Sequence, residues 1–174
     1  MVDQLTLQTY SIILTGIGMV IALTYYSLQI RNQNRNRRLQ IVKEIWDWIS
    51  TEEGYLRFAE LMTLRWTDFD DHNSKYGSTT NPEAYAKIWA AWNRLNGLGY
   101  MVKEGAIDAE TVYDHSGGRI VWMWRKYGPI VKEMRASHKI SYICKWWEYL
   151  VGEMERVGKE RGDKLELPEV WRTD

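Results

Sequence analysis

The amino-acid sequence predicts an all-α protein in which a single N-terminal transmembrane helix continues into a cytoplasmic helical bundle. Residues 4–30 contain no charged side chain, as a membrane-spanning helix requires. The apolar residues that follow recur at helical spacing, and no alternating pattern is long enough to predict a strand. The mean hydropathy of -0.47 excludes a protein with many membrane spans, so one anchor and one soluble domain are expected.

Residues 1–30 are the predicted transmembrane anchor. An α-helix formed by residues 4–30 would be roughly 40 Å long at a rise of about 1.5 Å per residue, and a bilayer hydrocarbon core is about 30 Å thick. A cleaved signal peptide carries basic residues before its apolar stretch, whereas here Asp3 precedes the apolar stretch and basic residues follow it. We therefore expect the anchor to stay uncleaved.

The basic residues after the anchor predict its orientation. Arg and Lys occur five times within residues 31–43, where the sequence has no acid. The positive-inside rule then places the N-terminus outside the cell membrane and residues 31–174 in the cytoplasm. Contacts with membrane lipids are expected from tyrosines at both ends of the anchor and from arginines just after it. These residues are Tyr10, Tyr25, Tyr26, Arg31, Arg35 and Arg38.

One face of the anchor carries small side chains. The residues that follow the i, i+4, i+7, i+11 spacing of a helix seam are Ser11, Thr15, Gly18 and Ala22. Small residues allow the backbones of two membrane helices to approach closely. The seam therefore predicts a helix–helix interface, either with a second copy of the chain or with a larger membrane complex. The alternative is that these residues reflect only the usual composition of transmembrane helices.

Beyond the anchor the chain divides by composition into three parts. Residues 31–50 contain no Pro or Gly, so the helix should leave the bilayer and continue as a basic juxtamembrane helix. Residues 51–162 form the predicted cytoplasmic helical bundle. Residues 163–174 contain a proline and show little periodicity, which is typical of a tail.

The first half of the bundle is predicted from its apolar spacing and its turn-forming residues. A helix is expected at about 55–67, followed by a polar loop at 67–81 that is rich in turn-forming residues. Asn81 followed by Pro82 predicts the N-cap and first turn of a third helix, which should reach about Val102.

The second half of the bundle is predicted from its helix breakers. Asp108 is the expected N-cap of a short fourth helix, which the glycine pair at 117–118 should end. A fifth helix from about residue 119 should be kinked or broken by the Gly-Pro pair at 128–129. A sixth helix is expected at about 140–160.

Several segments resemble a known family. They are SLQIRNQNRNRR after the anchor, then WNRLNGLGYMVKEGAIDAETVYD, then WRKYGPIVKEMR and WWEYL. Together they are similar to short bacterial and archaeal proteins of unknown function, in which one N-terminal transmembrane helix precedes an all-helical cytoplasmic domain. The resemblance covers most of the chain and implies a fold and an orientation. It implies no activity, so no catalytic residue is assigned by it.

The charge distribution disfavours nucleic acid as a partner. The net charge is +0, but five of the 23 basic residues and one of the 23 acidic residues lie before residue 44. Residues 44–174 therefore contain 18 basic and 22 acidic residues. Binding to nucleic acid depends mainly on neutralising phosphates, which a mildly acidic domain does poorly. The expected partners are membrane lipids, together with a second copy of the chain or a larger membrane complex.

One cluster has the composition of a metal site. Its members are Asp68, Asp70, Asp71 and His72. Carboxylates with a histidine can hold a divalent ion, but the longer pattern of a calcium loop is missing. A solvated acidic loop is the alternative interpretation, and no cofactor is expected.

The chain has a single cysteine, Cys144, so no intrachain disulfide forms. No histidine lies close to it in sequence to activate it as a nucleophile.

Two tryptophans, Trp48 and Trp124, lie outside the apolar stripes of their helices. Exposed aromatic side chains at such positions would mark a surface that binds a partner. The alternative is that they cover a thick core.

These observations favour one function and leave two alternatives open. The leading hypothesis is a non-enzymatic accessory or scaffold protein that binds a partner through the small-residue seam and the tryptophans. The second is a membrane-tethered metal-dependent hydrolase that uses the Asp68–His72 cluster. The third is a helical module that senses a small ligand bound between its helices.

Overall fold

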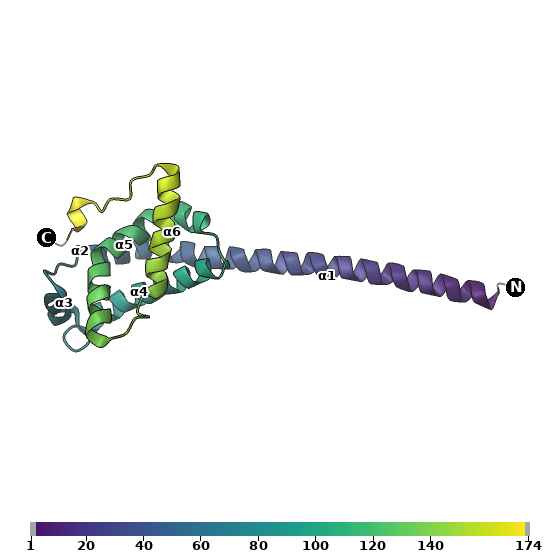
Figure 1. The fold of residues 1–174 in the computed structure, drawn as a ribbon, viewed down its shortest axis with the longest axis horizontal. Helices are drawn as coiled ribbons and strands as arrows, with labels where there is room; N and C mark the ends of the chain where they lie inside the picture. The colour runs from purple at the N-terminus through teal and green to yellow at the C-terminus, as the bar shows by residue number, and fades with distance from the viewer. Residues whose placement is uncertain (1–2, 173–174) are drawn as a thin grey trace. The chain divides into compact units, whose positions relative to one another are not determined.

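A computed structural model of the chain describes residues 3–172, and within these residues it is all-α, as predicted (Figure 1). Six α-helices and one short 3-10 helix follow one another, and no strand occurs among the described residues. The helices are α1 (Gln4–Ile49), α2 (Glu52–Thr63), α3 (Phe69–Tyr76), α4 (Pro82–Lys103), α5 (Ala109–His138) and α6 (Lys145–Arg161), and the 3-10 helix is η1 (Glu169–Trp171).

The chain divides into two compact units, Met1–Lys43 and Glu44–Asp174. In the described part of the chain, one helix is long and apolar enough to cross a membrane, and its candidate span is Leu7–Ile41. No described side chain between residues 7 and 37 is buried within the protein. Because residues 31–49 contain no helix breaker, α1 continues past the apolar stretch to Ile49 without interruption.

The prediction of a polar loop at 67–81 is wrong for its first half, where α3 forms. The Asp68 carboxylate caps this helix by accepting a hydrogen bond from the Asp71 N–H at 2.8 Å. Asp70 in the first turn and Lys75 in the last turn also match the helix dipole. Local capping therefore stabilises a short helix in a segment whose polar composition suggests a loop.

The predicted caps of the two longest bundle helices are confirmed. The Asn81 side chain accepts a hydrogen bond from the Ala84 N–H at 3.0 Å, and Pro82 begins α4, which ends at Lys103. The Asp108 carboxylate accepts from the Thr111 N–H at 2.7 Å at the start of α5. Both caps act within a few residues along the chain, so the sequence alone identifies them.

The prediction that the glycine pair at 117–118 ends a helix is wrong, because α5 runs through both glycines, and it also runs through the Gly-Pro pair at 128–129 without a break. The kink that was the alternative to a break at this pair stays a prediction. Buried residues flank both sites, so the packing of the helix within the bundle outweighs the local breakers. At Gly117 a side chain would collide with the Tyr113 ring, which shows why glycine occupies this buried position. Pro129 is exposed.

The last bundle helix begins later than predicted, at Lys145 instead of about residue 140. Residues 141–144 form turns, and Lys139 and Cys144 both have a positive φ, of 54° and 52°. Left-handed backbone at these positions is incompatible with a continuous α-helix. The helix ends at Gly162, whose φ of 77° is typical of a C-terminal glycine cap.

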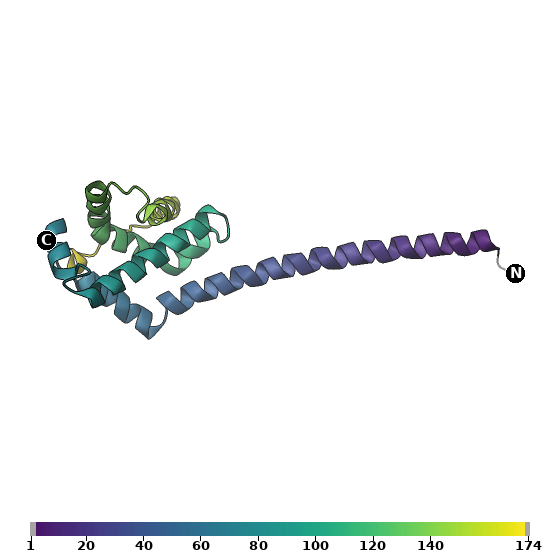
Figure 2. The same ribbon diagram turned by 90° about the horizontal axis from the view of Figure 1, so that it is seen from below.

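The core of the second unit lies where α6 packs against α4 and α5 (Figure 2). Trp92, Tyr127 and Trp147, one from each of these helices, have no exposed surface, and the Trp92 ring lies 5.7 Å from Tyr127 and 6.3 Å from Trp147. Aromatic rings at these separations contribute beyond the area that they bury. Gly99 on α4 lets α6 approach closely, because a Cβ there would lie 1.9 Å from the Trp146 carbonyl oxygen.

Candidate functional site

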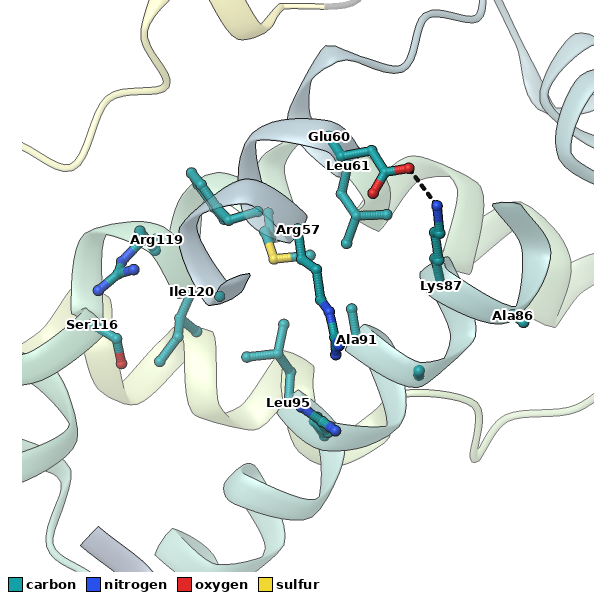
Figure 3. Close-up of a pocket in the computed structure, with 15 residues that line it drawn as sticks. Arg57, Glu60, Leu61, Ala86, Lys87, Ala91, Leu95, Ser116, Arg119 and Ile120 are labelled. Carbon is teal, nitrogen blue, oxygen red and sulfur yellow. Dashed lines mark hydrogen bonds and ion pairs between the residues drawn. The ribbon is translucent and has the colours of Figure 1, made fainter. Parts of the chain in front are cut away.

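A cavity of about 340 Å³ lies between α2, α4 and α5 (Figure 3). Small-molecule sites in proteins have volumes of roughly 300–1,000 Å³, so this cavity is large enough to be one. Its floor is formed by apolar side chains from all three helices. These are Phe58, Leu61, Leu95, Ile120 and Met123.

The cavity exists because α4 presents small side chains toward α2. Ala86, Ala90 and Ala91 all line it. Protein interiors are otherwise close-packed, and a larger side chain at any of these positions would occupy the space. Figure 3 shows the Arg57 side chain extending from α2 toward Ala91 on α4, so that a cation lies over the apolar floor.

Basic side chains dominate the polar part of the lining. They are Arg57, Lys87, Arg94 and Arg119. Glu60 is the only acid among the described residues that line the cavity. The Lys87 ammonium donates to Glu60 at 2.7 Å and pairs with Glu83 at 3.1 Å, and these hydrogen bonds, chiefly that to Glu60, raise the pKa of Lys87. The cavity is therefore lined by four basic side chains, two of which, Arg57 and Lys87, are paired with carboxylates.

One wall of the cavity is stiffened by Arg119 and Ser116 on α5. The Arg119 guanidinium lies 4.5 Å from the centre of the Tyr55 ring on α2, a cation–π contact that joins the two helices. Partial burial lowers the pKa of Arg119 below its ordinary value. The buried Ser116 hydroxyl donates to the Val112 carbonyl at 3.3 Å within the same helix.

The C-terminal end of α2 is fixed to α5 by two buried hydrogen bonds. The Tyr127 hydroxyl donates to the Leu61 carbonyl at 2.7 Å, and the Lys126 ammonium donates to the Met62 carbonyl at 2.6 Å. Lys126 also donates to the Trp171 carbonyl in η1 at 3.3 Å, and burial lowers its pKa to about 8. These bonds hold α2 at one end, and the cavity lies along the rest of its length.

The four residues of the acidic cluster do not converge on a common point. Asp68 caps α3, and Asp71 accepts hydrogen bonds from the Thr67 N–H at 2.9 Å and the Lys75 ammonium at 2.7 Å. His72 is turned into the protein, with its ring 4.9 Å from that of Trp66. Asp70 is exposed, and no group of three or more metal-ligating side chains occurs among the described residues.

The membrane residues named from the sequence lie on α1. The described ones are exposed, and they are Tyr10, Tyr25, Tyr26, Arg31 and Arg35, whereas the side chain of Arg38 is outside the described part. The seam residues Ser11, Thr15, Gly18 and Ala22 are exposed along the helix. The Thr15 hydroxyl donates to the Ser11 carbonyl at 2.8 Å, so this side chain satisfies its donor within the helix.

The two tryptophans proposed as partner contacts have different outcomes. The expectation that Trp124 is exposed is wrong, since only 9% of it is accessible and its ring packs 5.0 Å from Trp147. Its position lies off the main stripe because α5 is surrounded on several sides and buries more than one face. The side chain of Trp48 falls outside the described part of the structure.

The sequence reasoning did not find the cavity. Its signal was present as alanines at 86, 90 and 91, together with basic residues on three helices. Alanine is an ordinary helix former, however, and basic residues usually lie on solvated faces. Only the docking of α2 over this part of α4 turns these residues into a site.

Within the described residues, one helix long enough to cross a membrane and a helical bundle with a partly open cavity define the chain as an all-α protein with a candidate membrane anchor. A comparison with family models shows that the chain belongs to the family described as a domain of unknown function (DUF4760), which matches residues 12–154. The match includes most of the apolar helix and all the residues that line the cavity. Comparisons with curated proteins and with solved structures found no match.

Proposed function

We propose that the protein is a single-pass, non-enzymatic accessory or scaffold protein of the cell membrane, with its N-terminus outside and its helical bundle in the cytoplasm. The observation that carries the proposal is the apolar stretch of α1, whose described side chains are exposed over the length that a bilayer needs. The basic residues that follow this stretch support the orientation. A surface of this kind is stable in lipid and unstable in water.

The orientation is testable with cysteine variants at exposed positions near the two ends of the chain, Asp3→Cys and Lys164→Cys. The native Cys144 gives little background, because burial raises its pKa to about 12 and the thiolate is the reactive form. A membrane-impermeant maleimide should label Asp3→Cys in intact cells, and Lys164→Cys only after lysis. Labelling of Lys164→Cys in intact cells would contradict the orientation.

The proposed role is association through the seam formed by Ser11, Thr15, Gly18 and Ala22. Gly18 and Gly16 make a matched pair for testing it, because a Cβ at either position meets no other atom within 4 Å. Both positions therefore accept a side chain within a single copy of α1, but only Gly18 belongs to the seam. A bulky residue at Gly18 should keep a neighbouring helix at a distance.

The experiment compares Gly18→Ile with Gly16→Ile in native membranes. Chemical crosslinking followed by purification in mild detergent should recover a dimer or a larger complex from the wild type and from Gly16→Ile, and much less of it from Gly18→Ile. Equal recovery from both variants would show that the seam does not mediate association. A wild type that yields only monomers with no co-purifying protein would overturn the proposed role.

A second candidate function, the binding of a small ligand by the bundle, is favoured by the cavity between α2, α4 and α5. It has the volume of a ligand site, an apolar floor and converging polar groups, which together are the usual features of such sites. The two functions are compatible, because association is assigned to α1 and ligand binding to the bundle.

A further inference from the structure

We propose that the cavity between α2, α4 and α5 binds a small amphipathic anion, with an apolar body on the floor and a carboxylate or phosphate group beside Arg57, Lys87 and Arg94. This inference deepens the second candidate function and rests on it. It follows from three properties of the site: an apolar floor, four basic side chains in the lining, and ion pairs with exposed carboxylates.

The floor selects a ligand with an apolar body. Leu61, Leu95 and Ile120 are each almost fully buried and carry no polar side-chain atom. A strongly hydrated ion placed against them would lose water without gaining a partner, which is unfavourable. An aliphatic or aromatic body gains free energy there at about 25 cal/mol per Å² of apolar surface removed from water.

The cations select a negative head group. Four basic side chains line the cavity, against the single carboxylate of Glu60. An ammonium or guanidinium forms its strongest hydrogen bonds with carboxylates and phosphates, and an arginine can grip such a group with two parallel bonds. A cationic ligand would be repelled by these groups, and a neutral one would form weaker hydrogen bonds with them.

The ion pairs that already exist at the site do not prevent binding. Arg57 pairs with Glu53, and Lys87 pairs with Glu60 and Glu83, and every one of these carboxylates is exposed. Exposed ion pairs contribute little to stability, because water solvates both partners when they separate. A ligand anion in the less hydrated cavity can therefore replace a carboxylate as the partner of Arg57 at small cost.

The test uses the full chain in nanodiscs of neutral phosphatidylcholine and measures binding by titration calorimetry. The probes are 4-phenylbutyrate and 3-phenylpropyl phosphate, which present a carboxylate and a phosphate on the same phenylpropyl body, and the controls are neutral 4-phenylbutanol and inorganic phosphate. At least one anionic probe should bind saturably to one site, with a Kd of about 1 mM or below for a ligand of this size. Each control should bind at least about tenfold more weakly.

A result that differs from these expectations would overturn a specific part of the proposal. Equal affinity for 4-phenylbutanol would remove the requirement for charge, and equal affinity for inorganic phosphate would remove the requirement for an apolar body. If neither anion binds, the cavity is not a site for this class of ligand. The relative affinity of the two anionic probes identifies the preferred head group.

Variants locate the binding. Ala90→Phe should fill the cavity from an exposed position on α4 and weaken probe binding at least about tenfold. Ala136→Phe makes the same change at an exposed position on α5 outside the lining and should leave the affinity unchanged. If Ala90→Phe and Ala136→Phe bind the probe with equal affinity, the probe does not bind in the cavity. Circular dichroism verifies that each variant is folded.

A charge variant completes the test. Arg57→Gln should weaken binding of the anions and not of 4-phenylbutanol, whereas Arg156→Gln, which removes an exposed, ion-paired arginine from α6, should change neither. Equal effects of the two substitutions would show that only net charge matters. Because these experiments measure affinity and the seam experiment measures recovery of a complex, failure of one does not imply failure of the other.

Discussion

Asn96 in the middle of α4 caps the first turn of α6 at Trp146. Its side-chain oxygen accepts hydrogen bonds from the backbone N–H groups of Trp146 at 2.9 Å and Trp147 at 3.2 Å. The residue that precedes α6, Cys144, has a left-handed backbone, and its side chain makes no capping hydrogen bond. The cap that α6 lacks in its own sequence is therefore supplied by a neighbouring helix, which ties the formation of α6 to its docking.

Substitution of Asn96 tests this cap. Asn96→Ala should lower the free energy of unfolding by about 1 kcal/mol, because two donors at the start of α6 lose their acceptor. Asn96→Asp keeps an acceptor beside a helix N-terminus and should restore most of the loss. Chemical denaturation followed by circular dichroism measures both. If Asn96→Asp is as unstable as Asn96→Ala, the capping role is wrong.

Two glycines of α4 should respond in opposite directions to alanine. A Cβ at Gly99 would lie 1.9 Å from the Trp146 carbonyl oxygen, so Gly99→Ala must force α6 away from α4. This substitution should lower the free energy of unfolding by more than about 2 kcal/mol. A Cβ at Gly97 meets no atom within 4 Å, and alanine there should stabilise the helix by about 0.5–1 kcal/mol. Thermal unfolding of the two variants measures the difference. If Gly99→Ala is as stable as the wild type, α4 and α6 are not this close.

His72 should make the bundle sensitive to acid. Burial lowers its pKa to about 4 from 6.5, although the nearby Asp71 carboxylate acts in the opposite direction. Between these two pH values the unfolded chain binds a proton that the folded chain does not. The stability that depends on neutral His72 is therefore complete above pH 6.5 and is lost as the pH falls toward 4, by up to about 3 kcal/mol.

The variant His72→Phe should remove much of this acid sensitivity, because phenylalanine keeps a ring against Trp66 and cannot bind a proton. The denaturation midpoint of the wild type should be lower at pH 5 than at pH 7, and this difference should be smaller in His72→Phe. His138→Phe, at an exposed histidine, serves as the control. The same acid-induced loss in His72→Phe as in the wild type would assign the effect to other groups.

Lys126 should stabilise the contact between α2 and η1. Lys126→Met removes the donor to the Met62 and Trp171 carbonyls. It should lower the free energy of unfolding by about 1–3 kcal/mol, because the buried Met62 carbonyl loses this donor. The loss should appear as faster hydrogen exchange at the C-terminal end of α2. Lys132→Met, at an exposed position of the same helix, should have little effect. Equal exchange in the two variants would contradict the role of Lys126.

Features that depend on neighbouring residues were predicted from the sequence, and features that depend on packing were not. Asn81 and Asp108 bond to backbone groups three residues away, so the sequence identified both caps. The breaks expected within α5 did not occur, because their cost is offset by burial against helices distant in sequence. The α3 helix was missed because its polar residues match a loop in composition, although its capping residue, Asp68, was visible.

The candidate site depends on contacts that no local pattern reveals. Arg57 lies on α2, Lys87 on α4 and Arg119 on α5, and the sequence does not show that these cations surround one cavity. The apolar stretch of α1 is the opposite case, because its function in a bilayer depends on the composition of a single continuous segment. Composition therefore predicted a candidate anchor, and only the structure revealed the cavity.

The hydrogen bonds that fix α2 join residues far apart along the chain, 64 residues for Lys126 with Met62 and 66 for Tyr127 with Leu61. Closing such long loops costs entropy that is recovered only after the contact forms, so these contacts are slow to appear during folding. We therefore expect α2 to dock late, after α4, α5 and α6 have assembled, and to detach early when the bundle is destabilised. Because α2 forms one wall of the cavity, the cavity should be completed at the end of folding and lost at the start of unfolding.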